Sequence, residues 1–168
     1  RSVTPDPMPR LILLRHAKSA WDTDAPSDHE RPLNKRGRRD APIMGARLKT
    51  LGWVPDVVLS STATRTRQTW AAAAAHLAPE APVTFLPKLY LSGQRTVLPL
   101  LAAQTAETVM LIGHNPGWEE LASALTGQPL TMTTCNAALL LSEATDWPAA
   151  ASTPWALVDL LRPREPRQ

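Results

Sequence analysis

Six short apolar runs constrain the fold of this chain more than any other feature of its sequence. Runs of three to five apolar residues are typical of strands that are buried on both faces of a sheet. We therefore expect a central sheet of about six strands. The runs cover Leu11–Leu14, Val57–Leu59, Val83–Leu86, Val109–Ile112, Ala138–Leu141 and Leu157–Leu161.

Helical stretches separate most of these runs. Asn34 is the expected N-cap of the first helix, and Thr62 or Thr64 that of the second. Gly127 follows the last helix as a stop signal. Alternating strands and helices predict an α/β domain, with three layers (α/β/α) and a mainly parallel central sheet. The helices are expected at about 34–51, 62–77, 94–103 and 117–125.

The length of 168 residues suits one compact domain. We expect this single domain at 8–162, a flexible N-terminal extension at 1–7 with Met8 as a possible natural start, and a frayed C-terminal tail at 163–168. The segment 146–155, rich in Pro, Ala and Trp, is expected to form a surface loop between the last two strands.

Cysteine use and hydropathy suggest where the chain works. Cys135 is the only cysteine, which excludes an intramolecular disulfide and suits a reducing compartment. Leu11–Leu14 is far too short for a signal peptide core or a membrane span. We therefore expect a cytoplasmic monomer that is not bound to a membrane.

The charge pattern permits an anionic ligand without demanding a polyanion. The net charge is only +3. The basic run Lys35, Arg36, Arg38 and Arg39 opens a helix and is expected to form a solvated face. The six tryptophans are scattered without interleaved basic residues, so we expect no nucleic-acid partner.

Arginine and histidine residues follow three of the predicted strands. Arg15 and His16 follow the first strand, Arg65 lies shortly after the second, and His114 follows the fourth. In open α/β sheets, ligands bind beyond the carboxyl ends of the strands. We therefore expect these two arginines and two histidines to meet at one edge of the sheet.

These residue types are suited to phosphoryl transfer. The planar guanidinium group binds phosphate oxygens through two parallel hydrogen bonds and stays charged at ordinary pH, which predicts Arg15 and Arg65 as a phosphate clamp. A neutral imidazole with one nitrogen fixed by a hydrogen bond can act as a nucleophile, the role expected of His16. His114 would stabilise charge that develops on the same oxygens. Lys18 and Ser19 are expected to contact substrate.

The order and spacing of these motifs resemble those of the histidine phosphatase superfamily over residues 10 to about 127. The segment 28–37 (DHERPLNKRG) is most similar to the small SixA-like branch of phosphohistidine phosphatases. The resemblance implies a phosphoglycerate mutase-like fold, His16 as nucleophile, Arg15 and Arg65 as phosphate ligands, and His114 as the second active-site histidine. The other three motifs are LLRHAKS (13–19), SSTATRTRQT (60–69) and IGHNPG (112–117).

One departure from the superfamily pattern bears on the substrate. Larger members place a carboxylate general acid after the third strand, whereas residues 81–106 contain neither Asp nor Glu. This absence disfavours ordinary alcohol esters and a mutase. If another carboxyl group acts as the acid, Glu30 and Glu119 are the candidates, because each lies near a motif.

The expected function is therefore that of a metal-independent phosphatase with no cofactor. It would hydrolyse phosphohistidine in a protein or peptide through a covalent phosphohistidine on His16. One alternative is a phosphatase for small phosphate monoesters, such as sugar or nucleotide phosphates. Another is a phospho-ligand binding domain without turnover.

The positions of the other two histidines and of two tryptophans predict their environments. His76 is expected at the surface near a helix end, and His29 in a polar loop from which it at most reaches substrate. Neither a His-Glu-x-x-His motif nor paired cysteines occur, so no metal site is expected. Trp21 and Trp118 each follow a motif closely and are candidates for a pocket wall.

Overall fold

The computed structural model of the chain describes residues 8–164. The expected extension at 1–7 and the last four residues of the expected tail lie outside this range. Of the remaining tail residues, Arg164 contacts the buried Asp40 of the first helix, α1 (Lys35–Thr50), with its Nη2 3.3 Å from Oδ1. None of the described helices is long and apolar enough to cross a membrane.

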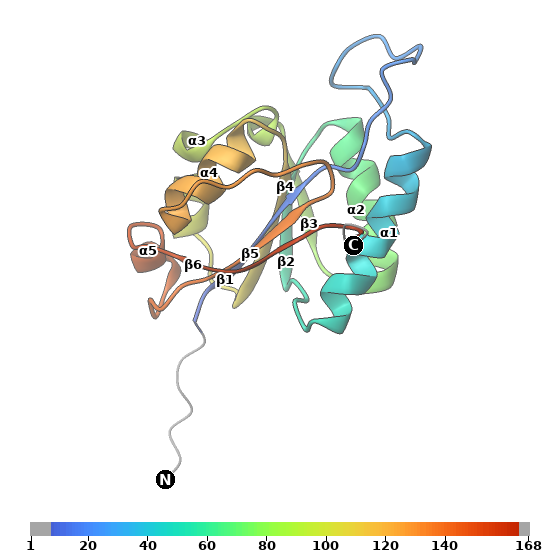
Figure 1. Cartoon of the computed structure of the whole chain (residues 1–168). Helices are drawn as coiled ribbons and strands as arrows, with labels where there is room; N and C mark the ends of the chain where they lie inside the picture. Colours follow the sequence, from blue (N-terminus) through green and yellow to red (C-terminus); the bar gives the residue numbers. More distant parts are fainter. Residues whose placement is uncertain (1–7, 165–168) are drawn as a thin grey trace.

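A six-stranded sheet forms the middle of the molecule, in the order β3-β2-β4-β1-β5-β6 (Figure 1). β5 pairs antiparallel with both β1 and β6, and the other three pairings are parallel, so the sheet is mainly parallel, as predicted. Each strand overlaps one of the predicted apolar runs. The strands are β1 (Arg10–Arg15), β2 (Val57–Ser61), β3 (Val83–Leu86), β4 (Thr108–Gly113), β5 (Ala137–Leu141) and β6 (Ala156–Leu161).

Helices cover both faces of this sheet and complete the predicted three layers (Figure 1). Successive side chains of a strand point to opposite faces. Ile12 and Leu14 of β1 accordingly pack in the core beneath α1 and α2, while Leu11 and Leu13 pack in the core beneath α3, α4 and α5. The helices are α1 (Lys35–Thr50), α2 (Thr64–Leu77), α3 (Gln94–Ala102), α4 (Gly117–Thr126) and α5 (Trp147–Ala150), with a 3₁₀ turn, η1, at Pro87–Leu89.

One of the two predicted helix caps is present in the structure and the other is not. Asn34 caps α1, since its side chain accepts a hydrogen bond from the Gly37 amide at 2.9 Å. Neither threonine caps α2, whose N-cap is Ala63 without a side-chain hydrogen bond. The Thr62 hydroxyl is hydrogen-bonded to His29 instead, at 2.8 Å. The Thr66 hydroxyl donates to the carbonyl of Ser61 and so joins the first turn of α2 to β2.

The expectation of a surface loop at 146–155 is wrong. The segment contains α5, and both Trp147 and Trp155 are buried with their rings 5.7 Å apart. Each indole N–H has a backbone partner: Trp147 donates to Ala106 at 2.6 Å and Trp155 to Ala150 at 2.9 Å. Because these polar atoms are satisfied, the rings can be buried against α3 and α4 as core.

Strand order brings the three motifs together. β2, β4 and β1 are adjacent and parallel, with Ser60 opposite Ile112 and Arg15 opposite Gly113. Their carboxyl ends therefore lie side by side at one edge of the sheet. This is the edge at which α/β sheets bind their ligands.

Candidate active site

His16 lies directly after β1 and is almost completely buried. Its Nδ1 is 2.7 Å from the carbonyl oxygen of Ala17. A carbonyl oxygen can only accept, so Nδ1 carries the proton and the lone pair is on Nε2. Local backbone geometry thus selects the tautomer that leaves Nε2 free to attack.

Backbone contacts from several elements hold this residue. The His16 amide donates to Gly113 of β4 at 3.1 Å, and its carbonyl accepts from Cys135 at 3.0 Å. The next amide, that of Ala17, donates to the Thr69 hydroxyl on α2 at 3.0 Å, and this hydroxyl donates to the Arg65 carbonyl at 2.7 Å. The first turn of α2, which carries Arg65, is therefore linked to the chain beside His16.

His114 follows β4 and faces His16, with the ring centroids 5.3 Å apart. Its Nε2 lies 2.8 Å from the Ser61 hydroxyl at the end of β2. If that hydroxyl donates, Nδ1 carries the proton and can donate to a ligand. Burial lowers the pKa of His16 to about 4 and that of His114 to about 3, and nearby positive groups add to both effects. Both rings are therefore neutral near pH 7.

The two arginines present buried donors at the same edge. Arg15 donates through Nη1 to the carbonyl of Met132 at 3.0 Å, and Arg65 is only 3% exposed. Within residues 8–164, four buried side-chain nitrogens have no hydrogen-bond partner. Three of the four are Nε of Arg15, Nε of Arg65 and Nδ1 of His114. An unpaired buried polar group costs about 1–3 kcal/mol, and this concentration is typical of a binding site for an anion.

Three further side chains of this site were not predicted. Arg65 donates to the carboxylate of Asp28 at 3.1 Å, Arg31 donates to the same carboxylate at 3.0 Å, and the Tyr90 hydroxyl donates to it as well. Asp28 and Arg31 belong to the DHERPLNKRG segment, whose resemblance to the SixA-like branch could have indicated them. Tyr90 directly follows η1, in an interval that contains no carboxylate.

The predicted substrate contacts Lys18 and Ser19 follow His16 in the same segment. The Ser19 hydroxyl accepts a hydrogen bond from Arg31 at 2.8 Å and is buried, whereas Lys18 is half-buried. His29 reaches the edge of the site, with its ring 4.9 Å from that of Tyr90. The roles of Lys18 and Ser19 in substrate contact stay predictions.

The two candidate acids differ in how they are held. Glu119 accepts from the Met132 amide at 2.8 Å and from the Asn115 side chain at 3.3 Å. It thereby holds the segment whose Met132 carbonyl binds Arg15. Glu30 is exposed and accepts from Ser27 at 3.3 Å. The structure thus gives Glu119 a supporting role in the site.

The two candidate pocket tryptophans lie in opposite environments. Trp118 is fully buried in the core and does not form a pocket wall. Its indole packs directly on Gly113, where an added Cβ would lie 2.4 Å from the ring. Trp21 is 74% exposed and stacks on the Arg31 guanidinium, with Cζ 3.6 Å from the ring centroid. His76 is exposed in the last turn of α2, as predicted.

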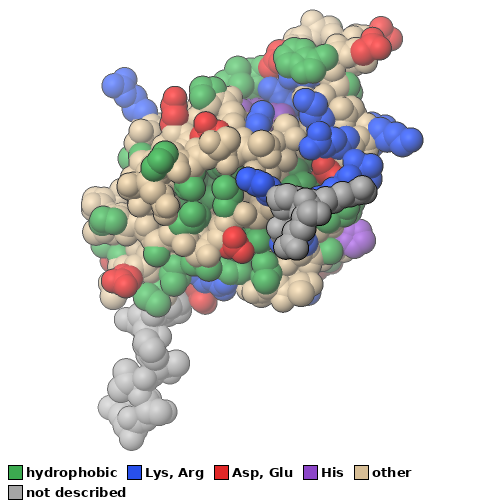
Figure 2. Space-filling view, in the orientation of Figure 1, with side chains coloured by type: hydrophobic (Ala, Val, Ile, Leu, Met, Phe, Trp, Pro, Cys, Tyr) green, Lys and Arg blue, Asp and Glu red, His purple; other side chains and the backbone are tan. Residues whose placement is uncertain are grey.

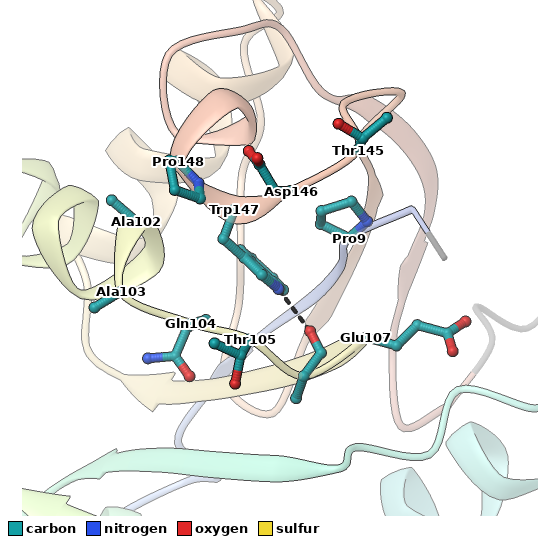
Figure 3. A pocket seen from close by; sticks show the side chains of 11 residues that line it. Pro9, Ala102, Ala103, Gln104, Thr105, Glu107, Thr145, Asp146, Trp147 and Pro148 are labelled. Atoms are coloured by element: carbon teal, nitrogen blue, oxygen red, sulfur yellow. Dashed lines mark hydrogen bonds between the residues drawn. The ribbon is translucent and has the colours of Figure 1, made fainter. Parts of the chain in front are cut away.

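The distribution of charged side chains differs between the two ends of the sheet. Figure 2 shows Lys and Arg side chains gathered around α1, where the predicted basic run is exposed. A hollow of about 520 Å³ lies at the opposite edge, beside the start of β1 and β4, with Trp147 in its wall (Figure 3). Its only ionisable lining residues are Glu107 and Asp146, which makes it unsuited to phosphate.

Sequence comparison identifies the family of the chain. The sequence model of the histidine phosphatase superfamily (branch 1) matches residues 11–90. The chain is 42% identical over 169 residues to an uncharacterised chloroplastic protein of Arabidopsis thaliana, an alignment that covers 92% of this chain and 78% of that protein.

Two solved structures are similar over nearly the whole chain. A structure from Agrobacterium tumefaciens, described as a phosphohistidine phosphatase SixA, is 33% identical, with a TM-score of 0.80 and coverage of 94% of this chain and 99% of that one. A protein histidine phosphatase SixA complexed with tungstate is 25% identical, with a TM-score of 0.78 and coverage of 92% and 97%. The chain therefore belongs to the histidine phosphatase superfamily as a SixA-like member, with the phosphoglycerate mutase-like fold predicted above, and is a histidine-nucleophile phosphatase.

Proposed function

We propose that this phosphatase hydrolyses phosphohistidine in a protein or peptide through a covalent phosphohistidine intermediate on His16. The observation that carries the proposal is the hydrogen bond from His16 Nδ1 to the Ala17 carbonyl, beside three buried and unpartnered donors of Arg15, Arg65 and His114. It supplies a nucleophilic nitrogen next to groups suited to three phosphoryl oxygens.

The reaction has two steps. His16 Nε2 attacks phosphorus, a bond from phosphorus to Nε2 forms, and the bond to the imidazole nitrogen of the substrate breaks with its electron pair. The substrate ring carries a proton on its other nitrogen and therefore leaves as neutral imidazole. Arg15, Arg65 and His114 stabilise the negative charge on the phosphoryl oxygens. Water then attacks phosphorus, and the bond to Nε2 breaks with its electron pair. Dihydrogen phosphate, which keeps both protons of the water, is released, and His16 returns to the neutral form with its proton on Nδ1.

The absence of a carboxylic acid after β3 supports an imidazole leaving group. General acid catalysis typically contributes about 100- to 10,000-fold, and an alkoxide leaving group depends on it strongly. Imidazole has a reference pKa of about 6.5, so it can leave as a weak base without a dedicated acid. The names of the two SixA structures, which refer to phosphohistidine and to protein histidine, point to the same substrate class for those proteins.

A trapping experiment tests the nucleophile. Enzyme mixed with ³²P-labelled phosphohistidine protein and quenched in alkaline detergent is expected to carry label that is stable in alkali and lost in acid. His16→Ala is expected to remain folded and carry none. His76→Ala, a substitution of an exposed histidine at the end of α2, serves as the control and retains the label. Turnover by His16→Ala at the wild-type rate contradicts the assignment.

A substrate panel tests the leaving group. We expect the highest kcat/KM for a phosphohistidine protein, and very low values for phosphoserine peptide and for sugar or nucleotide phosphates. For aryl phosphates, rates are expected to fall steeply as the phenol becomes more basic. Efficient hydrolysis of small monoesters, or a flat dependence on the leaving group, favours a small-molecule phosphatase with a different acid.

A further inference from the structure

We infer that Asp28 is a positioning residue of the active site, which fixes the Arg65 guanidinium so that its Nε edge faces the phosphoryl group. The inference rests on the proposed role of Arg65 in phosphate binding, but not on the identity of the leaving group. Asp28 lies on the segment that leads from β1 into α1, which rises above α1 and α2 in Figure 1.

Arg65 needs a partner because it is buried. A guanidinium that is 3% exposed has lost most of its hydration, and an unpaired charge in that environment is strongly destabilising. Asp28 supplies two acceptors: its carbonyl oxygen lies 2.7 Å from Nη1 of Arg65, and its carboxylate Oδ2 lies 3.1 Å from Nη2. No other side chain within residues 8–164 forms an ion pair with Arg65.

The two contacts use only one part of the guanidinium. Its five N–H donors lie in one plane, in a fixed arrangement. Asp28 takes the terminal nitrogens, whereas Nε of Arg65 stays buried without a partner. A phosphoryl oxygen can therefore bind at the Nε edge while Asp28 remains in place. Asp28 orients Arg65 and does not compete for the same donor.

Asp28 is itself held on two sides. The Tyr90 hydroxyl donates to Oδ2, and Nε of Arg31 donates to Oδ1 at 3.0 Å. Arg31 is 8% exposed and also donates to the Ser19 hydroxyl at 2.8 Å. The Tyr90 ring stands edge-on to His114, with ring centroids 5.4 Å apart. One carboxylate thereby connects the segment after His16, the start of α2 and the segment after η1.

The protonation states of Asp28 and Tyr90 suit a positioning role and do not suit proton transfer to a leaving group. Hydrogen bonds from Tyr90 and Arg31, together with Arg65, hold the pKa of the Asp28 carboxyl well below its usual range. Burial and the nearby carboxylate raise the pKa of Tyr90. Asp28 therefore stays ionised and Tyr90 keeps its proton, so neither group is suited to protonate a leaving group at neutral pH.

A double-mutant cycle tests the coupling between Asp28 and Arg65. Asp28→Ala, Asp28→Asn and Tyr90→Phe are made in the wild type and in Arg65→Ala, and binding of orthovanadate is measured together with kcat/KM for an aryl phosphate. In the wild type we expect Asp28→Ala to weaken vanadate binding about 10- to 100-fold and Asp28→Asn to have a smaller effect, because the amide retains an acceptor. Tyr90→Phe is expected to cost only a few-fold.

In the Arg65→Ala background the same Asp28 substitutions are expected to change vanadate binding less than about threefold, because the group that they position is gone. Asp24→Asn, an exposed carboxylate on the same segment, is the matched control and leaves both measurements unchanged. If Asp28→Ala does not fold, Asp28→Asn carries the cycle.

NMR of the Arg65 Nε–H group provides a readout that general destabilisation does not give. The wild type is expected to show a resolved, slowly exchanging signal that shifts on vanadate binding, and Asp28→Asn a broadened one at a temperature at which both proteins are fully folded. Full additivity in the cycle, or unchanged vanadate affinity in Asp28→Asn with an unaltered Nε signal, overturns the inference. A failure of the phosphohistidine proposal leaves these vanadate measurements unaffected, so the two failures are distinguishable.

Discussion

At the scale of single residues, the contact between the His16 ring and the Ala17 carbonyl decides which nitrogen can react. The donor on Nδ1 is satisfied within the backbone of the same segment, and Nε2 remains a free base. Burial disfavours the charged ring, so His16, the proposed nucleophile, is neutral in the free protein over a wide pH range. A bound phosphate dianion has the opposite effect, because it stabilises an imidazolium.

We predict that His16 titrates near pH 4 in the free protein, well below the reference value of 6.5. The ring is then neutral and nucleophilic above that pH and becomes protonated as the pH falls through it. The ¹⁵N shifts of selectively labelled histidine, assigned with His16→Asn, measure the transition. Saturating vanadate is expected to raise it. A midpoint near 6.5 in the free protein contradicts the burial argument.

We predict that Arg65→Ala lowers kcat/KM by about 30- to 1,000-fold, as is typical when one oxyanion donor is lost, whereas Arg67→Ala changes it little. Arg67 lies two residues further along α2, is exposed and stacks on Phe85, with Cζ 4.2 Å from the ring centroid. Steady-state kinetics on an aryl phosphate compares the two variants. Equal losses at both positions show that the wrong face of α2 was assigned to the site.

At the scale of elements, α1 is built against the active-site segment as well as against α2. Gly37 in its first turn packs on the backbone of Lys18, where an added Cβ would lie 2.1 Å from the Lys18 carbonyl oxygen. Gly45, two turns later, packs in the same way on Ala73 of α2, at 2.4 Å from its carbonyl oxygen. Both positions therefore require glycine, but only the first adjoins the chain that carries His16.

We predict that Gly37→Ala and Gly45→Ala each destabilise the fold by about 1–3 kcal/mol, because backbone must move to admit the methyl group. Only Gly37→Ala is expected to reduce kcat/KM strongly, since it displaces Lys18, two residues from His16. Urea unfolding and aryl phosphate kinetics measure the two effects separately. Similar activity in the two variants contradicts a rigid connection between α1 and the site.

At the scale of the whole molecule, two neutral histidines buried in one site link stability to pH. The pKa of each ring is lower in the folded protein than the 6.5 expected after unfolding. The unfolded state therefore binds protons first as the pH falls. The stability that this provides is complete above about pH 6.5. It is lost as the pH falls from there to about 4 for His16 and to about 3 for His114.

We predict that the free energy of unfolding falls by several kcal/mol between pH 6.5 and 4, since a shift of one pKa unit corresponds to about 1.4 kcal/mol. Urea unfolding followed at half-unit steps of pH measures the decrease. The double substitution His16→Asn and His114→Asn is expected to flatten it. Asp28 acts in a separate range, because its stabilising ionisation is lost only below its usual pKa of 3.8. An unchanged slope in the double variant would falsify the linkage.

Local patterns in the sequence determined the elements and the meeting of the four site residues. Apolar runs located all six strands, Asn34 and Gly127 bounded helices through their own backbone and side-chain preferences, and the strand-end rule located Arg15, His16, Arg65 and His114. These features depend on residues a few positions apart, and a sequence pattern records such spacings directly.

Tertiary structure alone decided the rest, because it depends on contacts between distant positions. Trp118, Trp147 and Trp155 are core because neighbouring layers cover them and backbone carbonyls accept their N–H groups, which no local signal in the chain specifies. The carboxylate of Asp28 meets Arg65, 37 residues away, and Tyr90, 62 residues away. Only the packing of the segment after β1 against α2 and η1 brings these groups together, and this packing underlies the orientation proposed for Arg65.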